Sequence, residues 1–220
     1  MTARQLLEHV ERTTADHVSA SIVWLHGLGA DGNDFVPLVD ELTRTAPCGV
    51  RFIFPHAPAQ PVTVNGGMTM PAWYDIRGLG DGIDEDEAGI ATARGHVEAL
   101  VQRERDRGVP TERILLAGFS QGAATAIHAA LSMATPPGGV VALSGWMPAG
   151  TEAGPGAAGL PVFMAHGTED PVVPIQLGRH AASQLQAAGA ALDWHEYAME
   201  HAVCLPQIQE LDAWLAGRLG

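Results

Sequence analysis

Apolar runs alternate with amphipathic stretches along most of this 220-residue chain. Short continuous apolar runs are typical of strands buried on both faces, whereas apolar residues spaced three and four positions apart indicate helices. The pattern predicts strands at residues 21–26, 49–54, 114–117, 139–144, 161–166 and 191–197, with an edge strand at residues 6–12. It predicts helices at residues 35–45, 84–107, 122–134, 174–188 and 205–219.

This alternation of strands and helices predicts an α/β fold with a mostly parallel central sheet and helices on both faces. The chain is long enough to bury a sizeable core. No repeat, low-complexity tract or linker interrupts it, so residues 1–220 are expected to form a single domain. Asn33 and Asp34 offer caps for the first helix, and the acidic residues at positions 84–87 suit the dipole at the start of the second.

One segment does not follow the alternation. Residues 55–84 are rich in proline and glycine and are expected to be irregular. A loop of that length inside a compact domain is usually functional or disordered. Met68, Met70, Trp73 and Tyr74 argue against disorder. An apolar loop beside the carboxyl ends of strands is suited to form the wall of a pocket.

Composition narrows the classes of partner. Apolar residues make up 46% of the chain and charged residues 17%, which fits a globular protein. Twelve Lys and Arg against 25 Asp and Glu give a net charge of −13. Nucleic acids and anionic membranes bind basic patches, so neither is an expected partner.

The cysteines bear on metal binding and on the compartment. Cys48 and Cys204 form no C-x-x-C pair and no Cys/His cluster with zinc spacing, so no metal is expected. Lone thiols favour a reducing compartment. The N-terminus lacks the pattern of a signal peptide, and no apolar run approaches the ~18 residues of a membrane span, so a cytoplasmic location is expected.

The strongest chemical signal is Gly118-Phe-Ser120-Gln-Gly122, a G-x-S-x-G motif between a predicted strand and a predicted helix. A nucleophile elbow requires that context, because its tight turn exposes a serine hydroxyl at the carboxyl end of the sheet. Side chains two positions before and after the serine would not fit such a turn, which explains the two glycines. We interpret Ser120 as a nucleophile; the alternative is a chance glycine-rich turn.

A serine hydroxyl needs a base within hydrogen-bond reach and an acid that orients the base. After a nucleophile elbow, the acid and then the histidine follow along the chain. Asp170 comes soon after the predicted strand at residues 161–166 and is favoured over the neighbouring Glu169. Asp193 and Glu196 lie within the next predicted strand, where exposed positions are the simpler interpretation.

The favoured base is His201, which lies between the last predicted strand and the last predicted helix. From there its side chain can reach the carboxyl edge of the sheet. His166 also ends a strand but precedes the acid in the chain. His180 and His195 lie inside a predicted helix and a predicted strand, where structural or surface roles are commoner.

The oxyanion of an acyl-transfer reaction needs two preorganised N–H donors. The amide of Gln121 is expected to be one, because it starts the helix after the serine and the helix dipole adds to its effect. The amide of Leu28 is expected to be the other, in the loop His26-Gly-Leu-Gly29. Flanking glycines let this backbone approach a substrate, although the loop by itself would be interpreted as a plain glycine turn.

Five segments together resemble the carboxylesterase/phospholipase family of α/β-hydrolases. They are His26-Gly-Leu-Gly-Ala-Asp-Gly, Pro55-His-Ala-Pro, Pro61-Val-Thr-Val-Asn-Gly-Gly-Met-Thr-Met-Pro-Ala-Trp-Tyr-Asp75, Gly118-Phe-Ser-Gln-Gly and His166-Gly-Thr-Glu-Asp-Pro-Val-Val-Pro. The similarity runs from about residue 20 to the C-terminus. Within the family, the bacterial broad-specificity carboxylesterases look more similar than the acyl-protein thioesterases.

The resemblance implies the α/β-hydrolase fold, the same nucleophile, acid and base, and the same two oxyanion donors. It implies that Met70, Trp73 and Val172 line the substrate pocket, and that no cofactor is needed. Members of the family are often homodimers, so a homodimer is a possible assembly. The expected function is that of a serine carboxylesterase that hydrolyses small esters with short to medium acyl chains through an acyl-enzyme.

Two alternatives stay open on this evidence. An acyl-protein thioesterase or lysophospholipase would need a long apolar groove. A non-catalytic binding module on the same fold is disfavoured by the intact set of serine, aspartate and histidine.

One residue departs from the family pattern. A glycine usually precedes the histidine, and this chain has Glu200. Its side chain is expected to point into solvent. The alternative hypothesis places its charge beside His201, where it would favour the protonated imidazole.

Overall fold

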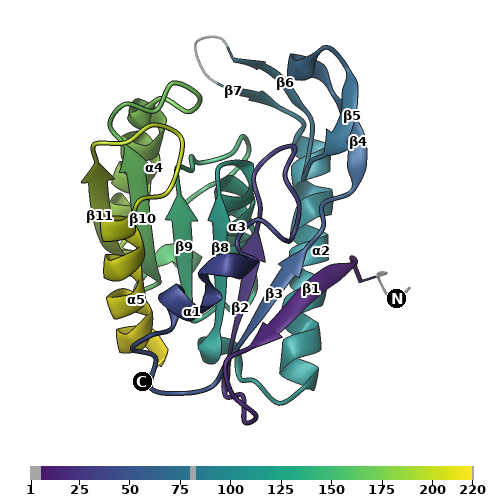
Figure 1. Ribbon diagram of the computed structural model, residues 1–220. Helices are drawn as coiled ribbons and strands as arrows, with labels where there is room; N and C mark the ends of the chain where they lie inside the picture. Colours follow the sequence, from purple (N-terminus) through teal and green to yellow (C-terminus); the bar gives the residue numbers. More distant parts are fainter. Residues whose placement is uncertain (1–5, 80–82, 220) are drawn as a thin grey trace.

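The computed structural model describes residues 6–79 and 83–219 (Figure 1). Seven strands form the central sheet in the order β1-β3-β2-β8-β9-β10-β11. Their bounds are β1 His9–Thr13, β2 Ala20–Leu25, β3 Val50–Pro55, β8 Ile114–Phe119, β9 Gly139–Leu143, β10 Pro161–Gly167 and β11 Ala191–Tyr197. Only β1, at the edge, pairs antiparallel, and the other pairs are parallel. The mostly parallel sheet predicted from the sequence is confirmed.

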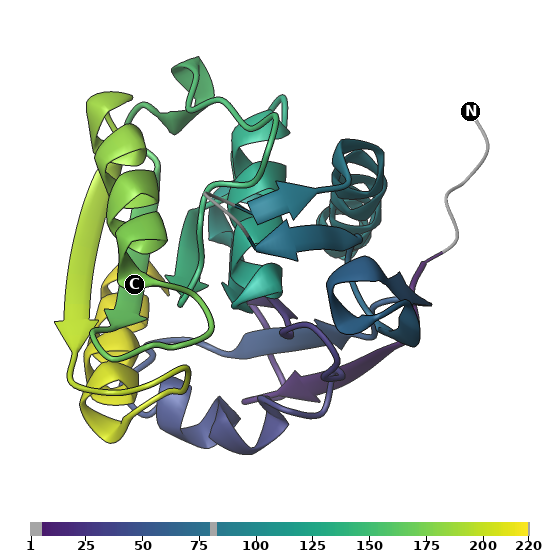
Figure 2. The ribbon, with the colours of Figure 1, turned by 90° about the horizontal axis from the view of Figure 1, so that it is seen from above.

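Within the described residues, five α-helices cover the two faces of this sheet. They are α1 Val39–Leu42, α2 Glu87–Asp106, α3 Gln121–Ser132, α4 Ile175–Ala187 and α5 Leu205–Leu219. Seen from above, α1 and α5 lie on one face, and α2, α3 and α4 lie on the other (Figure 2). This view looks onto the carboxyl ends of the parallel strands, the edge where the loops after β2, β8, β10 and β11 meet.

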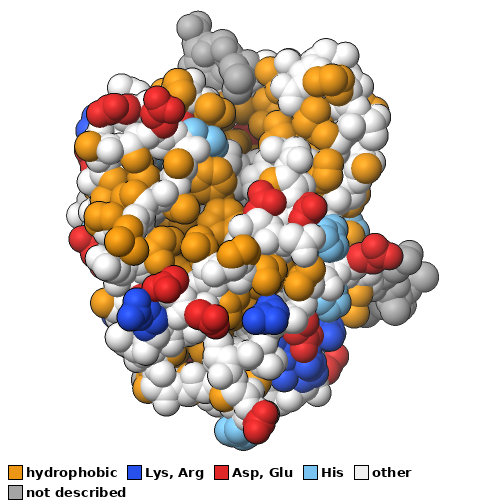
Figure 3. Space-filling view, viewed as in Figure 1, with side chains coloured by type: hydrophobic (Ala, Val, Ile, Leu, Met, Phe, Trp, Pro, Cys, Tyr) orange, Lys and Arg blue, Asp and Glu red, His pale blue; other side chains and the backbone are white. Residues whose placement is uncertain are grey.

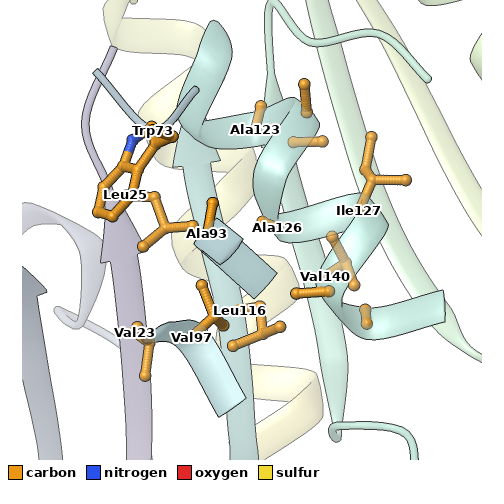
Figure 4. Packing of buried hydrophobic residues seen from close by; sticks show 14 of the residues in the cluster. Val23, Leu25, Trp73, Ala93, Val97, Leu116, Ala123, Ala126, Ile127 and Val140 are labelled. Atoms are coloured by element: carbon orange, nitrogen blue, oxygen red, sulfur yellow. The ribbon is translucent and has the colours of Figure 1, made fainter. Parts of the chain in front are cut away.

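Successive residues of each central strand point to opposite faces, so one apolar run supplies two cores. Val23 and Leu25 of β2 belong to the core under α2 and α3. Ile22 and Trp24 of the same strand belong to the core under α1 and α5. In the first core, small side chains of α2 and α3 meet the strands directly (Figure 4). The continuous apolar runs of the sequence are therefore explained by burial on both faces.

Two local predictions were wrong. Residues 35–45 form a 3-10 turn, Val36–Leu38, followed by the four-residue α1, with a proline in the first turn. The side chain of Asn33 does not cap this segment, because it donates to Asp31 Oδ1 at 2.9 Å. The acidic run at residues 84–87 spans a boundary: Asp86 caps α2 through Gly89 N, and the two residues before it lie in a strand.

The segment at residues 55–84 is also more regular than predicted. Strands β4 Ala59–Val62 and β5 Met68–Pro71 form one hairpin, and β6 Ile76–Leu79 and β7 Ile83–Glu85 form another. Residues 80–82 of the predicted loop, and residues 1–5 and 220 of the predicted domain, lie outside the described residues. Among the described helices, none is both long enough and apolar enough to cross a membrane.

The packing of α5 against the sheet can be tested with two identical substitutions in one helix. Leu211 is fully buried, whereas Leu205 is 63% exposed. Leu211→Ala is expected to lower the free energy of unfolding by about 2–5 kcal/mol, because it leaves a cavity in the core. Leu205→Ala should change it by no more than about 0.5 kcal/mol. Urea unfolding of both variants measures the difference, and equal effects would contradict the described orientation of α5.

Candidate active site

Ser120 stands between β8 and α3 in a strained backbone conformation, with φ 55° and ψ −123°. A positive φ is uncommon for a residue other than glycine, and such strain persists only where the surrounding structure enforces it. The serine is mostly buried and lines a cavity at the carboxyl ends of the strands. The turn therefore has the shape that the G-x-S-x-G motif predicts for a nucleophile elbow.

The two glycines of the motif are required by close backbone contacts. A Cβ atom on Gly118 would lie 2.4 Å from the carbonyl carbon of Gly122. A Cβ atom on Gly122 would lie 2.2 Å from the carbonyl oxygen of Leu25, at the end of β2. Neither position can hold a side chain unless the backbone moves. The first turn of α3 consequently lies directly against the strand that precedes the glycine-rich loop.

Asp170 and His201 form a short hydrogen bond on the other side of the cavity. Asp170 Oδ2 accepts from His201 Nδ1 at 2.6 Å, and its Oδ1 accepts from the backbone N–H groups of Val172 at 2.9 Å and Val173 at 2.8 Å. These three donors bind a buried carboxylate. Burying its charge without hydrogen bonds would cost free energy. Since His201 Nδ1 carries the donated proton, the neutral ring has Nε2 as its acceptor.

Backbone contacts bring the aspartate loop and the histidine loop together. Thr168 N donates to Tyr197 O at 2.8 Å, and Glu169 N donates to Met199 O at 3.1 Å. The loop also passes so close to the end of β10 that a Cβ atom on Gly167 would lie 2.3 Å from Met199 O. These contacts place the two predicted partners side by side although 31 positions separate them.

Ser120 and His201 line the same cavity. No hydrogen bond joins their side chains within the part of the chain that the structure describes. The imidazole instead lies beside the ring of Phe119, with ring centroids 4.7 Å apart. Hydrogen bonds between a nucleophile and its base often form or shorten only when a substrate binds.

The predicted oxyanion donors belong to two residues of the cavity lining. Leu28 and Gln121 both line the cavity, and among the described residues neither backbone N–H donates to a protein acceptor. The side chain of Gln121 is engaged elsewhere: its Oε1 accepts from Trp73 N at 3.0 Å, and its Nε2 donates to Tyr74 O at 2.8 Å. Gly29 N donates to Pro71 O at 2.9 Å, which fixes the glycine-rich loop beside the same segment.

The cavity has a volume of about 340 Å³. The space-filling view shows a hollow near the top of the molecule with hydrophobic side chains along its border (Figure 3). The apolar residues that line the cavity are Leu28, Ala30, Val64, Ile76, Ile83, Phe119, Trp146, Val172 and Val173. The walls thus offer mainly apolar surface around the serine and the histidine.

The structure places one of the three predicted pocket residues in the lining of the cavity. Val172 lines the cavity, but Met70 and Trp73 do not. Met70 sulfur accepts from Asn65 Nδ2 at 3.2 Å, and the buried Trp73 donates through Nε1 to His26 O at 2.8 Å. Both side chains support the loops behind the cavity. From this segment, the cavity is instead lined by Val64 and Asn65 of the turn between β4 and β5, and by residues of the β6–β7 hairpin.

The comparison with known proteins decides the family. The sequence matches the model of the family described as phospholipase/carboxylesterase over residues 8–217. The chain belongs to this family. The α/β-hydrolase fold and the family suggested by the five sequence segments are confirmed, and the protein is a hydrolase of the phospholipase/carboxylesterase family.

Individual relatives refine this placement. Acyl-protein thioesterase 1 of Gibberella zeae is 36% identical over 221 residues, which cover 93% of each chain. The crystal structure of Zea mays acyl-protein thioesterase 2 superposes with a TM-score of 0.80 at 29% identity and covers 97% of this chain and 100% of its own. The Bacillus cereus carboxylesterase shares the fold, with a TM-score of 0.78 at 22% identity over 98% of this chain and 96% of its own. The sequence favoured the bacterial carboxylesterases, but the similarity to acyl-protein thioesterases is the higher of the two.

The other candidates for acid and base lie outside the cavity of this hydrolase. Glu169 and His180 are exposed. His195 stacks on Phe163 with ring centroids 4.7 Å apart, and Glu196 forms an ion pair with Arg179. These positions agree with the structural or surface roles that the sequence indicated for His180, His195 and Glu196.

Glu200 has an exposed side chain, as the simpler interpretation expected. Within the described residues it forms no ion pair with His201. Its contribution to the site is the backbone of the loop, because Glu200 O lies 2.5 Å from where a Cβ atom on Gly167 would stand.

The sequence did not reveal Glu85, a buried carboxylate that holds one wall of the cavity. Its Oε1 accepts from Tyr74 Oη at 2.7 Å and from Trp146 Nε1 at 2.8 Å, and its Oε2 accepts from Ala149 N at 2.7 Å. Trp146 lines the cavity, and so do residues of the β6–β7 hairpin that carries Glu85. Glu85 lies in a run of acidic residues, and no local pattern in this run marks one carboxylate as buried. Only the tertiary structure therefore identifies it.

The close approach at the elbow can be tested with glycine-to-alanine substitutions in two helices of this hydrolase. Gly122→Ala is expected to destabilise the protein by about 1–3 kcal/mol or more, since the new methyl group would overlap the end of β2. A Cβ atom on Gly217 of α5 would stand in open space, so Gly217→Ala should stabilise the protein by about 0.4–1 kcal/mol. Thermal unfolding checks both, and shifts of the same sign would contradict the contact described for Gly122.

The role of Glu85 gives a prediction that depends on pH. Glu85→Gln is expected to lower the free energy of unfolding by about 1–3 kcal/mol, because only one terminal atom of glutamine accepts hydrogen bonds and one buried donor is left unpaired. Burial raises the pKa of Glu85, so ionising it costs more in the folded than in the unfolded chain. The stabilisation from Glu85 is therefore complete below its ordinary pKa and declines as the pH rises through the raised value.

Urea unfolding at a series of pH values measures this effect. The difference between wild type and Glu85→Gln should shrink as the pH rises through the raised pKa. The neighbouring Asp84 is 67% exposed, so Asp84→Asn serves as the control and should change stability by no more than about 0.5 kcal/mol. A difference that does not vary with pH would contradict a raised pKa for Glu85.

Proposed function

We propose that this protein is a serine hydrolase that cleaves acyl thioesters, and oxygen esters of the same acyl groups, through an acyl-enzyme. The observation that supports it best is the 2.6 Å hydrogen bond between His201 Nδ1 and Asp170 Oδ2, beside a cavity that also holds the strained Ser120. This arrangement supplies a nucleophile, a base and an acid that orients the base.

The reaction follows from the proton positions. His201 Nε2 takes the proton of Ser120 while the serine oxygen attacks the acyl carbon, and the bond to sulfur or oxygen of the leaving group then breaks. The imidazolium returns its proton to that leaving group. Water, activated by the same nitrogen, then attacks the acyl-enzyme and releases the carboxylic acid. The amides of Leu28 and Gln121 stabilise the negative oxygen in both halves of the reaction.

Two observations bear on the substrate. The thioester class is supported by the 36% identity to an acyl-protein thioesterase over 93% of both chains. A lysophospholipid is less well supported, because the described lining of the cavity offers its phosphate no cationic side chain. Among the described residues that line the cavity there is no Lys or Arg, and the one fixed charge is that of Asp34.

Hydrolysis of carboxylic esters with short to medium acyl chains is the second candidate. The cavity volume of about 340 Å³ supports it, because ligand pockets commonly span roughly 300–1,000 Å³ and this one lies near the lower limit. A catalytically silent binding module is disfavoured by the hydrogen-bonded pair beside the strained serine. A homodimer and a cytoplasmic location stay predictions from the sequence.

Ser120→Ala tests the proposed nucleophile. The variant is expected to lose on the order of 10⁴- to 10⁶-fold in kcat on acyl thioesters and esters, because no other described residue of the cavity lining carries a hydroxyl group. A fluorophosphonate probe should label wild type at Ser120 and leave the variant unlabelled. Ser132→Ala, the same substitution at an exposed position in α3, should retain full activity. Turnover at the wild-type rate by Ser120→Ala would end the proposal.

The acyl preference separates the two candidate functions. Matched thioesters and oxygen esters carrying acetyl, butyryl, octanoyl and palmitoyl groups should be compared by kcat/KM. A thioesterase of long acyl groups should gain activity toward palmitoyl, because each added methylene is buried against the apolar walls. A decline beyond butyryl or octanoyl on both series would instead support the short-chain carboxylesterase.

A further inference from the structure

His166 is a second histidine at the same carboxylate, and the proposed chemistry does not use it. It is the penultimate residue of β10, has no exposed surface and does not line the cavity. Its Nε2 lies 3.5 Å from Asp170 Oδ2, whereas His201 Nδ1 lies 2.6 Å from the same oxygen. A histidine with no path to the substrate cannot act as the base, so its burial calls for another explanation.

We propose that His166 is a positioning residue that holds the turn at residues 170–173 and thereby keeps Asp170 directed toward His201. This inference rests on the proposed roles of Ser120, Asp170 and His201. Three contacts support it: the bond from the ring to the turn, the bonds from the turn to the carboxylate, and the fit of the ring against α4.

The first contact fixes the proton on the His166 ring. Nε2 lies 2.8 Å from the carbonyl oxygen of Val173. A carbonyl only accepts hydrogen bonds, so Nε2 carries a proton and donates it. The ring nitrogen Nδ1 has no hydrogen-bond partner among the described residues. Burial lowers the pKa of His166, so the neutral ring with its proton on Nε2 is the stable form.

The second set of contacts links the His166–Val173 hydrogen bond to the carboxylate of Asp170. Val173 receives the His166 bond at its carbonyl, and its N–H donates to Asp170 Oδ1 at 2.8 Å. The N–H of Val172 donates to the same oxygen at 2.9 Å. Oδ1 is thus held by the turn, and Oδ2 is left to face His201. The ring of His166 fixes the far end of the turn that holds the carboxylate.

The third contact fixes the ring itself. A Cβ atom on Gly178 would lie 2.5 Å from His166 Nδ1, so α4 can lie against the imidazole only because this residue is glycine. The indole of Trp194 is a further neighbour of the ring, with ring centroids 6.4 Å apart. A ring enclosed in this way has little room to change its rotamer, and this preserves the direction of the Nε2–H bond.

A pair of amide substitutions tests the inference. Gln at position 166 can place its side-chain nitrogen near the position of Nε2 and reach Val173 O, whereas the shorter Asn cannot. His166→Asn is expected to lower kcat about 10- to 100-fold, because a small displacement of the acid misaligns the base. KM should change less. His166→Gln should recover most of the lost kcat, and both variants bury the same chemical group.

A second readout does not depend on turnover. The short charge-assisted bond from His201 Nδ1 to Asp170 should give a far-downfield proton resonance. It should persist in wild type, in Ser120→Ala and in His166→Gln, and be displaced or lost in His166→Asn. His128 is another buried histidine, bonded to Thr151 at 2.8 Å and away from the cavity lining. His128→Asn is the control for burying an amide, and it should leave kcat and the resonance unchanged.

The outcomes separate this inference from the proposed function. Equal losses of kcat in the Gln and Asn variants, a similar loss in His128→Asn, or an unchanged resonance in His166→Asn would overturn the positioning role. In each of these cases an inactive Ser120→Ala would still support the proposed function. An active Ser120→Ala would instead remove the proposed function, and the resonance would then report on the His166 restraint alone.

Discussion

The candidate nucleophile depends on one close backbone contact, between the first turn of α3 and the end of β2. A Cβ atom on Gly122 would lie only 2.2 Å from Leu25 O, so the approach requires a residue without a side chain. The same approach brings Gln121 within hydrogen-bond distance of Trp73 N and Tyr74 O. The strained serine, the amide that starts α3 and the segment before β6 are therefore positioned together, because each is bonded to or packed against the same turn.

The acid and base depend on a different constraint, the burial of a carboxylate. A buried carboxylate is tolerated only where hydrogen bonds replace its hydration. At Asp170 the turn that follows β10 supplies two backbone donors and the loop that follows β11 supplies His201. The donors come from separate loops, so satisfying the charge also brings those loops together. Backbone bonds from Thr168 and Glu169 to the second loop strengthen the same contact.

At the wall of the cavity, a second buried carboxylate also joins separate segments through its hydrogen-bond donors. Glu85 is buried and accepts from a tyrosine in one part of the chain and from a tryptophan and a backbone amide in another, at residues 74 and 146–149. The β6–β7 hairpin and the loop that carries Trp146 are thereby joined behind the lining of the cavity. Because these polar groups lie behind the walls, the lining of the cavity itself is mainly apolar. This division suits the proposed reaction, in which apolar surface binds the acyl group and the proposed N–H donors stabilise the carbonyl oxygen.

Periodicity and motif spacing along the chain were enough to identify the parallel sheet, the elbow at Ser120 and the order of the candidate acid and base. These features are local, since a strand, a helix and a tight turn each depend on residues within a few positions of one another. Only the tertiary structure decided that residues 55–84 form two hairpins, that Trp73 supports the cavity from behind, and that Glu85 and His166 are buried supports. Each of these depends on contacts between segments far apart in the sequence, and no local pattern records which buried partners a polar side chain will meet.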